Sequence, residues 1–322
     1  MRVRALVLTL CTAGAGLAPN FLWGAVVGGQ APAEPGTAAS HVERGNALHA
    51  KGDIEGAIAE YRQALHLEPD YADAHYNLGI TLEAKGDIDG AVSEDREAIR
   101  LEPGYAGSHE NLASALQKKG DLEGAIAEYR VAVRLDPGDA TAHNTFGLLL
   151  RYVGDTEGAV AEFRAAVRAD PQFAEAHNNL AMALKATGDL RGAIVEYRQA
   201  LRLQPNAAGL HYNLGVALKT TGDLDGAIAE YRETIRLQPD ISQAHNNLGT
   251  ALREKGALAD AIAEYREAIR LKPDNAMAHY NLGIALEKRG DRAGALDQYR
   301  LATQLDPKDP DFAAGAQRLS RM

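Results

Sequence analysis

The chain has 322 residues, of which 46% are hydrophobic and 24% are charged, a composition typical of a soluble folded protein. Its formal net charge of −10 argues against a nucleic-acid-binding protein, because no stripe of Lys and Arg strong enough to release counterions stands out. The single cysteine is Cys11. If the N-terminal stretch is removed, no thiol remains for disulfides or thiolate chemistry.

Residues 1–33 differ from everything that follows. Arg2 and Arg4 precede an apolar stretch, and Ala31-Pro32-Ala33 forms a small-residue cleavage pattern before Glu34. This order is typical of a signal peptide. We therefore expect a mature chain that begins near Glu34 and is periplasmic or secreted.

An uncleaved membrane anchor is the alternative for this segment. Residues 5–28 approach the roughly 20 apolar residues that span a bilayer. Pro19 and Asn20 interrupt that stretch, which favours the cleaved form. Contact with a membrane is expected only through this segment if it is retained, and residues 34–37 are expected to form a linker.

A fixed 34-residue period runs through the rest of the chain. Such a period indicates one supersecondary unit repeated in tandem. Its clearest marker is a set of eight prolines: Pro69, Pro103, Pro137, Pro171, Pro205, Pro239, Pro273 and Pro307. Eight units fit between residues 38 and 309, and their first residues are 38, 72, 106, 140, 174, 208, 242 and 276. Positions below are counted from the first residue of each unit.

Residues 72–105 illustrate the unit. Apolar and small residues recur at three- and four-residue spacing after Ala72, which predicts a helix that ends at Gly86. Asp87 then caps a second helix, which ends before Pro103. Each unit is therefore expected to be a helix, a tight turn, a second helix and a Pro-marked turn.

Three positions carry the packing of the two helices. Position 8 is always Gly or Ala and position 20 is always Ala, so the helices can approach closely. Position 24 is Tyr or Phe in every unit except the second, which has Asp95. We expect this carboxylate to be costly unless it swings into solvent and leaves a void.

The combination of Gly or Ala at position 8, Ala at 20, Tyr or Phe at 24, Ala at 27 and Pro at 32 resembles the tetratricopeptide repeat. The resemblance covers residues 38–309. It implies an all-α, right-handed superhelical solenoid of antiparallel helix pairs, whose first helices line a concave groove that binds extended peptides. Residues 310–322 are then expected to form a capping helix over the last repeat.

Position 4 is histidine in every unit: His41, His75, His109, His143, His177, His211, His245 and His279. Neighbouring first helices should lie about 8–10 Å apart, whereas a Zn–N bond is about 2 Å long. Successive imidazoles therefore cannot share an ion, and a structural role that satisfies a backbone group is expected. We expect no metal and no cofactor. The Arg row at position 25, from Arg62 to Arg300, with Glu two residues earlier in seven of eight units, is expected to form a solvated face.

Position 6 carries the candidate binding residues. Asn is an indifferent helix former, yet it recurs there as Asn77, Asn111, Asn179, Asn213, Asn247 and Asn281. Its amide offers a donor and an acceptor, so a row of them can bond the backbone of an extended peptide. We expect such amides to lack partners within the protein. The alternatives are that they bond the backbones of neighbouring repeats or were copied by duplication, and Glu43 and Thr145 interrupt the row.

Further candidates flank this row. Position 5 contributes flat rings at Tyr76, Tyr212 and Tyr280. Position 12 contributes a basic edge that can meet carboxylates: Arg151, Lys185, Lys219 and Arg253. The pattern resembles the asparagine ladder of eukaryotic-type O-linked N-acetylglucosamine transferases. That resemblance implies that the ladder residues hold substrate peptides.

No sequence motif for catalysis is present, so no enzymatic activity is expected. The leading interpretation is a non-enzymatic scaffold that binds an extended peptide or an envelope protein. One alternative is a substrate-recruiting or regulatory component of a glycosyltransferase system. Another is a structural assembly factor.

Overall fold

The computed structural model describes residue 34 and residues 36–320, and every regular element among them is an α-helix. The predicted signal or anchor segment lies outside these residues. None of the described helices is both long and apolar enough to cross a membrane. The chain divides into two compact units, which meet between Gly138 and Asp139 and are considered separately below.

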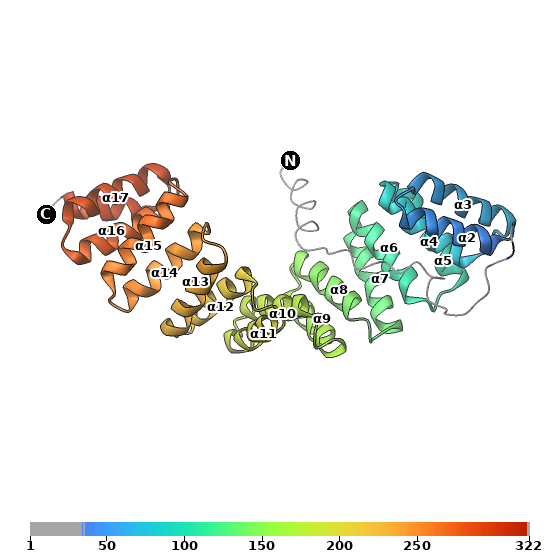
Figure 1. Ribbon diagram of the computed structural model, residues 1–322, viewed down its shortest axis with the longest axis horizontal. Helices are drawn as coiled ribbons and strands as arrows, with labels where there is room; N and C mark the ends of the chain where they lie inside the picture. The colour runs from blue at the N-terminus through green and yellow to red at the C-terminus, as the bar shows by residue number, and fades with distance from the viewer. Residues whose placement is uncertain (1–33, 35, 321–322) are drawn as a thin grey trace. The chain divides into compact units, whose positions relative to one another are not determined.

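Unit 1 holds the first three helix pairs. Its helices are α2 (Ala38–Ala50), α3 (Ile54–Leu67), α4 (Ala72–Lys85), α5 (Ile88–Leu101), α6 (Ala106–Lys119) and α7 (Leu122–Leu135). Each first helix packs against the second helix of its own repeat, and each second helix packs against the first helix of the next (Figure 1).

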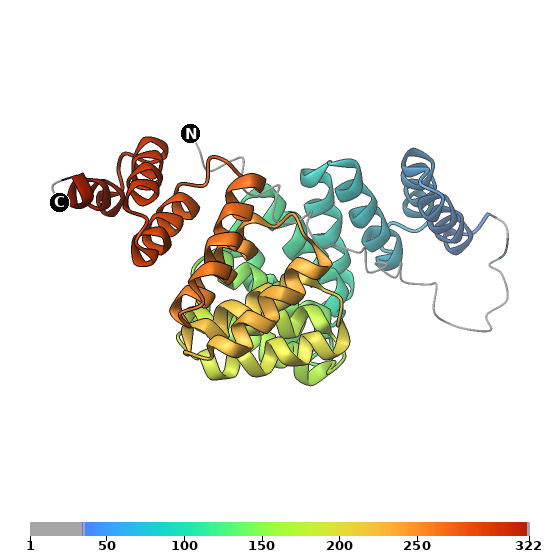
Figure 2. The same cartoon turned by 60° about the vertical axis from the view of Figure 1, so that its left-hand side comes forward.

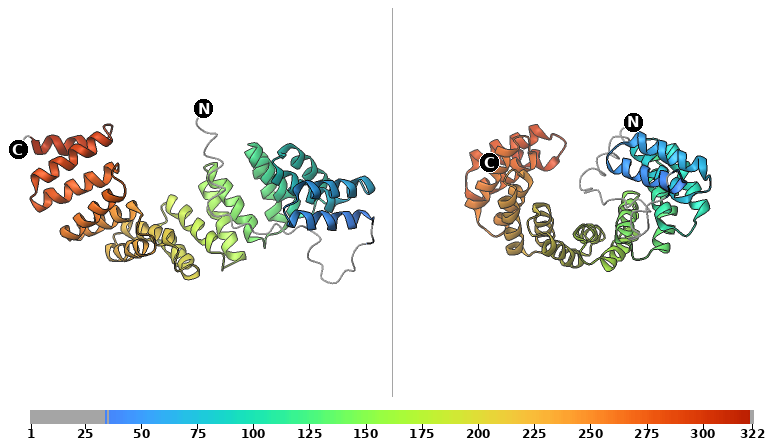
Figure 3. Two further views of the ribbon diagram at one scale, coloured as in Figure 1. Left: turned by 45° about the horizontal axis from the view of Figure 1, so that its top comes forward. Right: turned by 45° about the vertical axis from the view of Figure 1, so that its right-hand side comes forward.

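Unit 2 continues the pattern with five helix pairs and a final single helix. Its helices are α8 (Ala140–Tyr152), α9 (Thr156–Ala169), α10 (Ala174–Ala186), α11 (Leu190–Leu203), α12 (Ala208–Thr220), α13 (Leu224–Leu237), α14 (Ser242–Glu254), α15 (Leu258–Leu271), α16 (Ala276–Arg289), α17 (Arg292–Leu305) and α18 (Pro310–Ser320). The pairs of unit 2 follow one another in the view of Figure 2. Figure 3 shows the same stacking from two further sides. The last helix, α18, packs against α17.

The turn between the paired helices follows from Gly and Asp. Gly86 adopts a φ of 89°, a left-handed conformation that a side chain would strain, and it ends α4. Asp87 then accepts a hydrogen bond from the Gly90 amide at 3.0 Å and caps α5. The exception is α15, where Ala257 takes the cap position and supplies no side-chain bond.

The small residue at position 8 makes room for the ring at position 24. A Cβ built on Gly215 would lie 2.8 Å from Cε1 of Tyr231, a ring that is fully buried. A larger side chain at position 215 would therefore push α12 away from α13.

Asp95 remains inside the protein in the second repeat. Its side chain is 0% exposed, and neither carboxylate oxygen has a hydrogen-bond partner. Burial, together with repulsion from Glu83 and Glu94, raises the pKa of Asp95 to about 8. The expected cost is therefore present, and the carboxylate does not escape it by swinging into solvent.

Candidate functional site

Three of the four position-6 asparagines of unit 2, which we call the ladder residues, donate to a position-5 side chain of the preceding repeat. Asn179 donates from Nδ2 to Oδ1 of Asn144 at 3.0 Å. Asn281 donates in the same way to Oδ1 of Asn246 at 3.0 Å. The expectation that ladder amides lack partners within the protein is therefore wrong for these residues, because position 6 of one first helix faces position 5 of the preceding one.

We call each ladder residue a rung. The third bonded rung is Asn247, whose acceptor is a tyrosine rather than an asparagine. Asn247 donates from Nδ2 to the Tyr212 hydroxyl at 3.0 Å. Position 5 therefore has a role that the sequence did not reveal, since it supplies the acceptor for the next rung. The signal available in the sequence was the 35-residue separation between an acceptor at position 5 and an amide at position 6.

Asn213 differs from the other three rungs. Its side chain is half-buried and has no hydrogen-bond partner within the described residues. Its neighbour at position 5 is Asn178, which donates instead to the Met182 sulfur at 3.7 Å. The Asn178 Oδ1 is buried without a partner. Asn213 is thus the rung with the most hydrogen-bonding capacity to spare.

The bonded rungs also retain capacity. An Asn amide has two N–H donors and a carbonyl oxygen, and each cross-repeat bond uses one donor. Within the described residues, buried side-chain atoms without a partner belong to Asn77, Asp95, Asn111, Asn178, Tyr197 and Tyr231. None of these atoms belongs to the four ladder residues of unit 2, of which Asn179 and Asn281 are 5% and 8% exposed.

Unit 1 does not offer an equivalent row. Asn77 is 0% exposed, and its amide oxygen and nitrogen are both buried without partners. It cannot meet a ligand in this conformation, which corrects the prediction for Asn77. Asn111 is half-buried, and its Nδ2 is also buried without a partner.

Tyr76 is a core residue rather than a flat contact surface. It is 6% exposed and packs edge-on against Tyr105, with ring centroids 5.3 Å apart. In the sixth repeat, the equivalent Tyr212 instead packs at 6.1 Å from the ring of Tyr231. The second repeat has Asp95 in place of that ring, so Tyr76 has a different neighbour. Tyr76 is therefore packed within unit 1, and its predicted contact with a partner stays a prediction.

The basic edge lies on successive first helices of unit 2, and all four of its residues are partly exposed. Arg151 donates from Nη1 to the Met182 sulfur at 3.8 Å, and Lys219 forms a long ion pair with Glu254 at 3.8 Å. Arg253 donates to the Tyr265 hydroxyl at 3.3 Å. Lys185 has no ion pair within the described residues. The edge is therefore only weakly neutralised by the protein itself.

The histidine column has a structural role, as predicted. His245 places Nδ1 at 2.7 Å from Glu264 Oε2 and Nε2 at 3.1 Å from the carbonyl oxygen of Pro239. Burial lowers the pKa of His245, but these two bonds and the charges of Glu264 and Glu267 outweigh it, so the net shift is upward. Equivalent pairs of bonds occur at His75, His109, His177, His211 and His279, the last with Gln298 in place of Glu.

The glutamates at position 23 are therefore not merely part of a solvated face. In seven repeats the Glu accepts from the histidine of its own repeat, and each is less than one-third exposed. The sequence signal was the recurrence of His and Glu with a constant separation of 19 residues. Among the described residues, no group of His, Cys, Asp and Glu is arranged to hold a metal ion.

Sequence comparison decides the family. A profile described as TPR repeat matches residues 45–86, 115–151, 147–188, 183–222 and 249–290. Two profiles described as tetratricopeptide repeat match residues 72–105, 208–241 and 276–309. The chain belongs to the tetratricopeptide repeat family. The predicted all-α solenoid of antiparallel helix pairs is thereby confirmed.

Several solved structures share this fold. YrrB, described as a TPR protein with an unusual peptide-binding site, is 22% identical, with a TM-score of 0.53 over 60% of this chain and 98% of its own. MamA from Desulfovibrio magneticus RS-1 is 20% identical, with a TM-score of 0.51 over 54% and 98%. The APC/C hetero-tetramer Cut9-Hcn1 is 15% identical, with a TM-score of 0.51 over 87% and 55%. The comparison with curated proteins finds no match.

Proposed function

We propose that unit 2 is a non-enzymatic scaffold that binds an extended peptide of a partner protein. The binding surface is the ladder face, defined as positions 5, 6 and 12 of α8, α10, α12, α14 and α16. On it, Asn179, Asn213, Asn247 and Asn281 bond the peptide backbone.

The observation that carries this proposal is the cross-repeat bonding of the ladder. The bonds from Asn179, Asn247 and Asn281 to position 5 fix the orientation of each amide before a ligand arrives. A pre-oriented group loses little conformational entropy on binding. Each fixed amide still offers one N–H and a carbonyl oxygen, and a peptide backbone supplies the matching acceptor and donor.

The chemistry beside the ladder indicates the class of peptide. Lys185 has no ion pair within the described residues, and Lys219 has only a long one. Tyr212 and Tyr280 are partly exposed and add apolar contact area. A peptide with carboxylate side chains opposite the basic edge fits this surface, and screening by salt should weaken that part of the interaction. The peptide-binding description of YrrB lends support to this class of partner.

The N-terminal pattern around Arg2, Arg4 and Ala31-Pro32-Ala33 supports export of the chain, so the partner is an envelope or secreted protein. The alternative role in a glycosyltransferase system rests on the ladder pattern alone.

Selection from a random-peptide phage library against the purified protein tests the proposal. The wild type should enrich a set of related peptides, and Asn213→Ala should bind them more weakly. Asn206→Ala is the matched control, because Asn206 is an exposed turn residue outside the ladder face. Failure to enrich any peptide, or equal loss with both variants, would contradict the proposed function.

A further inference from the structure

The ladder does not continue into α18, because the residues of this helix that align with positions 5 and 6 carry no side-chain amide. This helix begins at Pro310, one 34-residue period after Ala276, the first residue of α16. Its positions 5 and 6 are therefore Ala314 and Gly315. Each earlier cross-repeat bond joins residues 35 apart. The next pair at that separation is Tyr280 and Gly315, and glycine has no amide side chain to donate.

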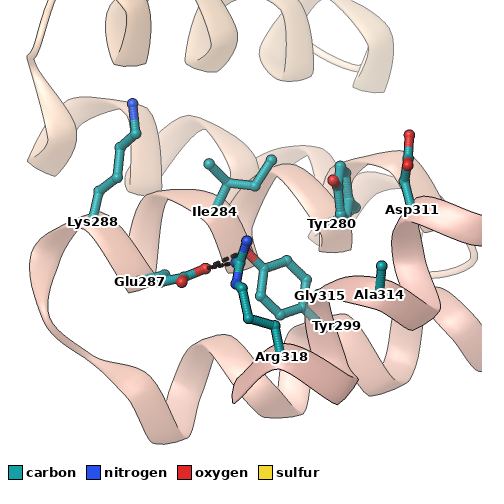
Figure 4. Close-up of a pocket in the computed structure, with 9 residues that line it drawn as sticks. All are labelled: Tyr280, Ile284, Glu287, Lys288, Tyr299, Asp311, Ala314, Gly315 and Arg318. Atoms are coloured by element: carbon teal, nitrogen blue, oxygen red, sulfur yellow. Dashed lines mark hydrogen bonds and ion pairs between the residues drawn. The ribbon is translucent and has the colours of Figure 1, made fainter. Parts of the chain in front are cut away.

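A cavity of about 670 Å³ occupies this place between α16 and α18, and we call it the terminal hollow. Figure 4 shows the side chains that surround it: Tyr280, Ile284, Glu287, Lys288, Tyr299, Asp311, Ala314, Gly315 and Arg318. Its volume lies within the range of small-ligand sites. Ala314 and Gly315, which take positions 5 and 6 in α18, both line this hollow.

Tyr280 is held rigidly at the edge of the terminal hollow. Its ring centroid lies 5.6 Å from that of Tyr299 and 4.9 Å from that of Phe312. The Tyr280 hydroxyl has no hydrogen-bond partner within the described residues. The equivalent hydroxyl of Tyr212 accepts from Asn247. Tyr280 is thus an oriented acceptor whose usual donor is absent.

The charges around the terminal hollow balance. Glu287 Oε2 accepts from the Tyr299 hydroxyl at 2.8 Å and from Arg318 Nη2 at 2.5 Å, so this carboxylate is already paired. Lys288 and Asp311 stand at opposite ends of the row formed by Ile284 and Tyr280 (Figure 4). Two positive and two negative side chains therefore line the hollow, and a neutral polar group fits it better than an ion.

We propose that the terminal hollow binds the side-chain amide of a Gln or Asn in the bound peptide, which donates to the Tyr280 hydroxyl as Asn247 donates to Tyr212. The peptide supplies the rung that Gly315 lacks. This inference rests on the proposed function and deepens it: the ladder amides bond the peptide backbone, whereas the terminal hollow selects one side chain.

The test sequences the phage pools selected by the wild type and by three variants. Tyr280→Phe removes the acceptor and keeps the ring that packs against Phe312. Ala314→Trp fills the hollow from an exposed position, and Gln317→Trp is its control because Gln317 is exposed on α18 but does not line the hollow. Melting temperatures confirm that each variant is folded.

The wild type and Gln317→Trp should enrich Gln or Asn at one peptide position, and Tyr280→Phe and Ala314→Trp should lose that preference. Replacing this Gln or Asn by Ala in a synthetic peptide should weaken binding to the wild type about 3- to 10-fold, as expected for one neutral hydrogen bond. Pools without Gln or Asn at a fixed position, or a preference that survives Tyr280→Phe, would overturn the inference and leave the scaffold proposal standing. Pools with no enriched peptide would overturn both.

Discussion

Asn281 donates a hydrogen bond from Nδ2 to Oδ1 of Asn246, one repeat earlier, at 3.0 Å. The same geometry joins Asn179 to Asn144. These amides therefore connect neighbouring first helices and also present free polar atoms. A structural role and a binding role are compatible here, because one amide has more hydrogen-bonding groups than the cross-repeat bond uses.

Replacing ladder residues by Ala should separate bonded from unbonded rungs in a thermal unfolding experiment. Asn179→Ala and Asn281→Ala each remove a cross-repeat bond, worth about 0.5–1.5 kcal/mol, partly offset by the better helix propensity of Ala. Asn213→Ala removes no bond within the described residues, so its stability should stay equal or rise. Equal destabilisation by all three substitutions would show that Asn213 has a structural role not evident from its contacts.

Asp95→Asn should change how stability depends on pH. The folded-state pKa of Asp95 is raised to about 8 from a reference of 3.8. An acid whose pKa is higher in the folded state stabilises that state most at low pH. This stabilisation is lost as pH rises from about 4 to about 8. The variant does not titrate at this position. Its stability relative to wild type should therefore rise over that window by on the order of a few kcal/mol and then level off.

Urea unfolding at several pH values measures this difference. Any cost of burying an unpaired Asn amide lowers the free energy of unfolding of the variant equally at every pH, so it does not change the pH dependence. Parallel curves for wild type and Asp95→Asn between pH 4 and pH 8 would mean that Asp95 is ionised without penalty in the folded state.

The histidine column should give a second pH dependence. The pKa of His245 is raised in the folded state. Its contribution to the free energy of unfolding is therefore complete below about pH 6.5 and is lost as pH rises through the folded-state pKa. The stability gap between wild type and His245→Gln should therefore narrow above pH 6.5. His279→Gln is the matched control, since Nδ1 of His279 faces the neutral Gln298 rather than a carboxylate. A stability difference between wild type and His245→Gln that stays constant from pH 6 to pH 9 would contradict this expectation.

Restoring the missing cap of α15 should stabilise the seventh helix pair of the chain, which is formed by α14 and α15. In seven repeats an Asp caps the second helix through the amide of a Gly three residues later, as Asp223 does with Gly226 at 2.9 Å. In the repeat that contains α15, the cap position and the position three residues later hold Ala257 and Asp260. A cap is worth about 0.5–2 kcal/mol. Ala257→Asp with Asp260→Gly should raise the melting temperature more than Ala257→Asp alone, because Asp260 would repel the new carboxylate.

Local features of the fold were predictable because each repeat is specified by nearby residues. Gly86 and Asp87 adopt the left-handed turn and the cap that their sequence indicates. The site was less predictable because it depends on contacts between repeats. The burial of Tyr76 depends on its contact with Tyr105, and the pairing of Asn247 with Tyr212 depends on the offset between two first helices. The terminal hollow depends on the register of α18 relative to α16, which places Gly315 opposite Tyr280.

Backbone N-methylation of a selected peptide tests the central claim most directly. If Asn213 bonds the peptide backbone, methylating one peptide N–H should weaken binding to the wild type, because the methylated nitrogen cannot donate to the amide oxygen. The same methylation should have little further effect on the affinity of Asn213→Ala, since that bond is already absent. Fluorescence anisotropy measures the affinity of wild type and of Asn213→Ala for the unmethylated and the methylated peptide. These four affinities give the coupling energy between the substitution and the methylation. Additive losses at every N-methylated position for all four ladder residues would show that no ladder residue accepts a hydrogen bond from the peptide backbone, contrary to this claim.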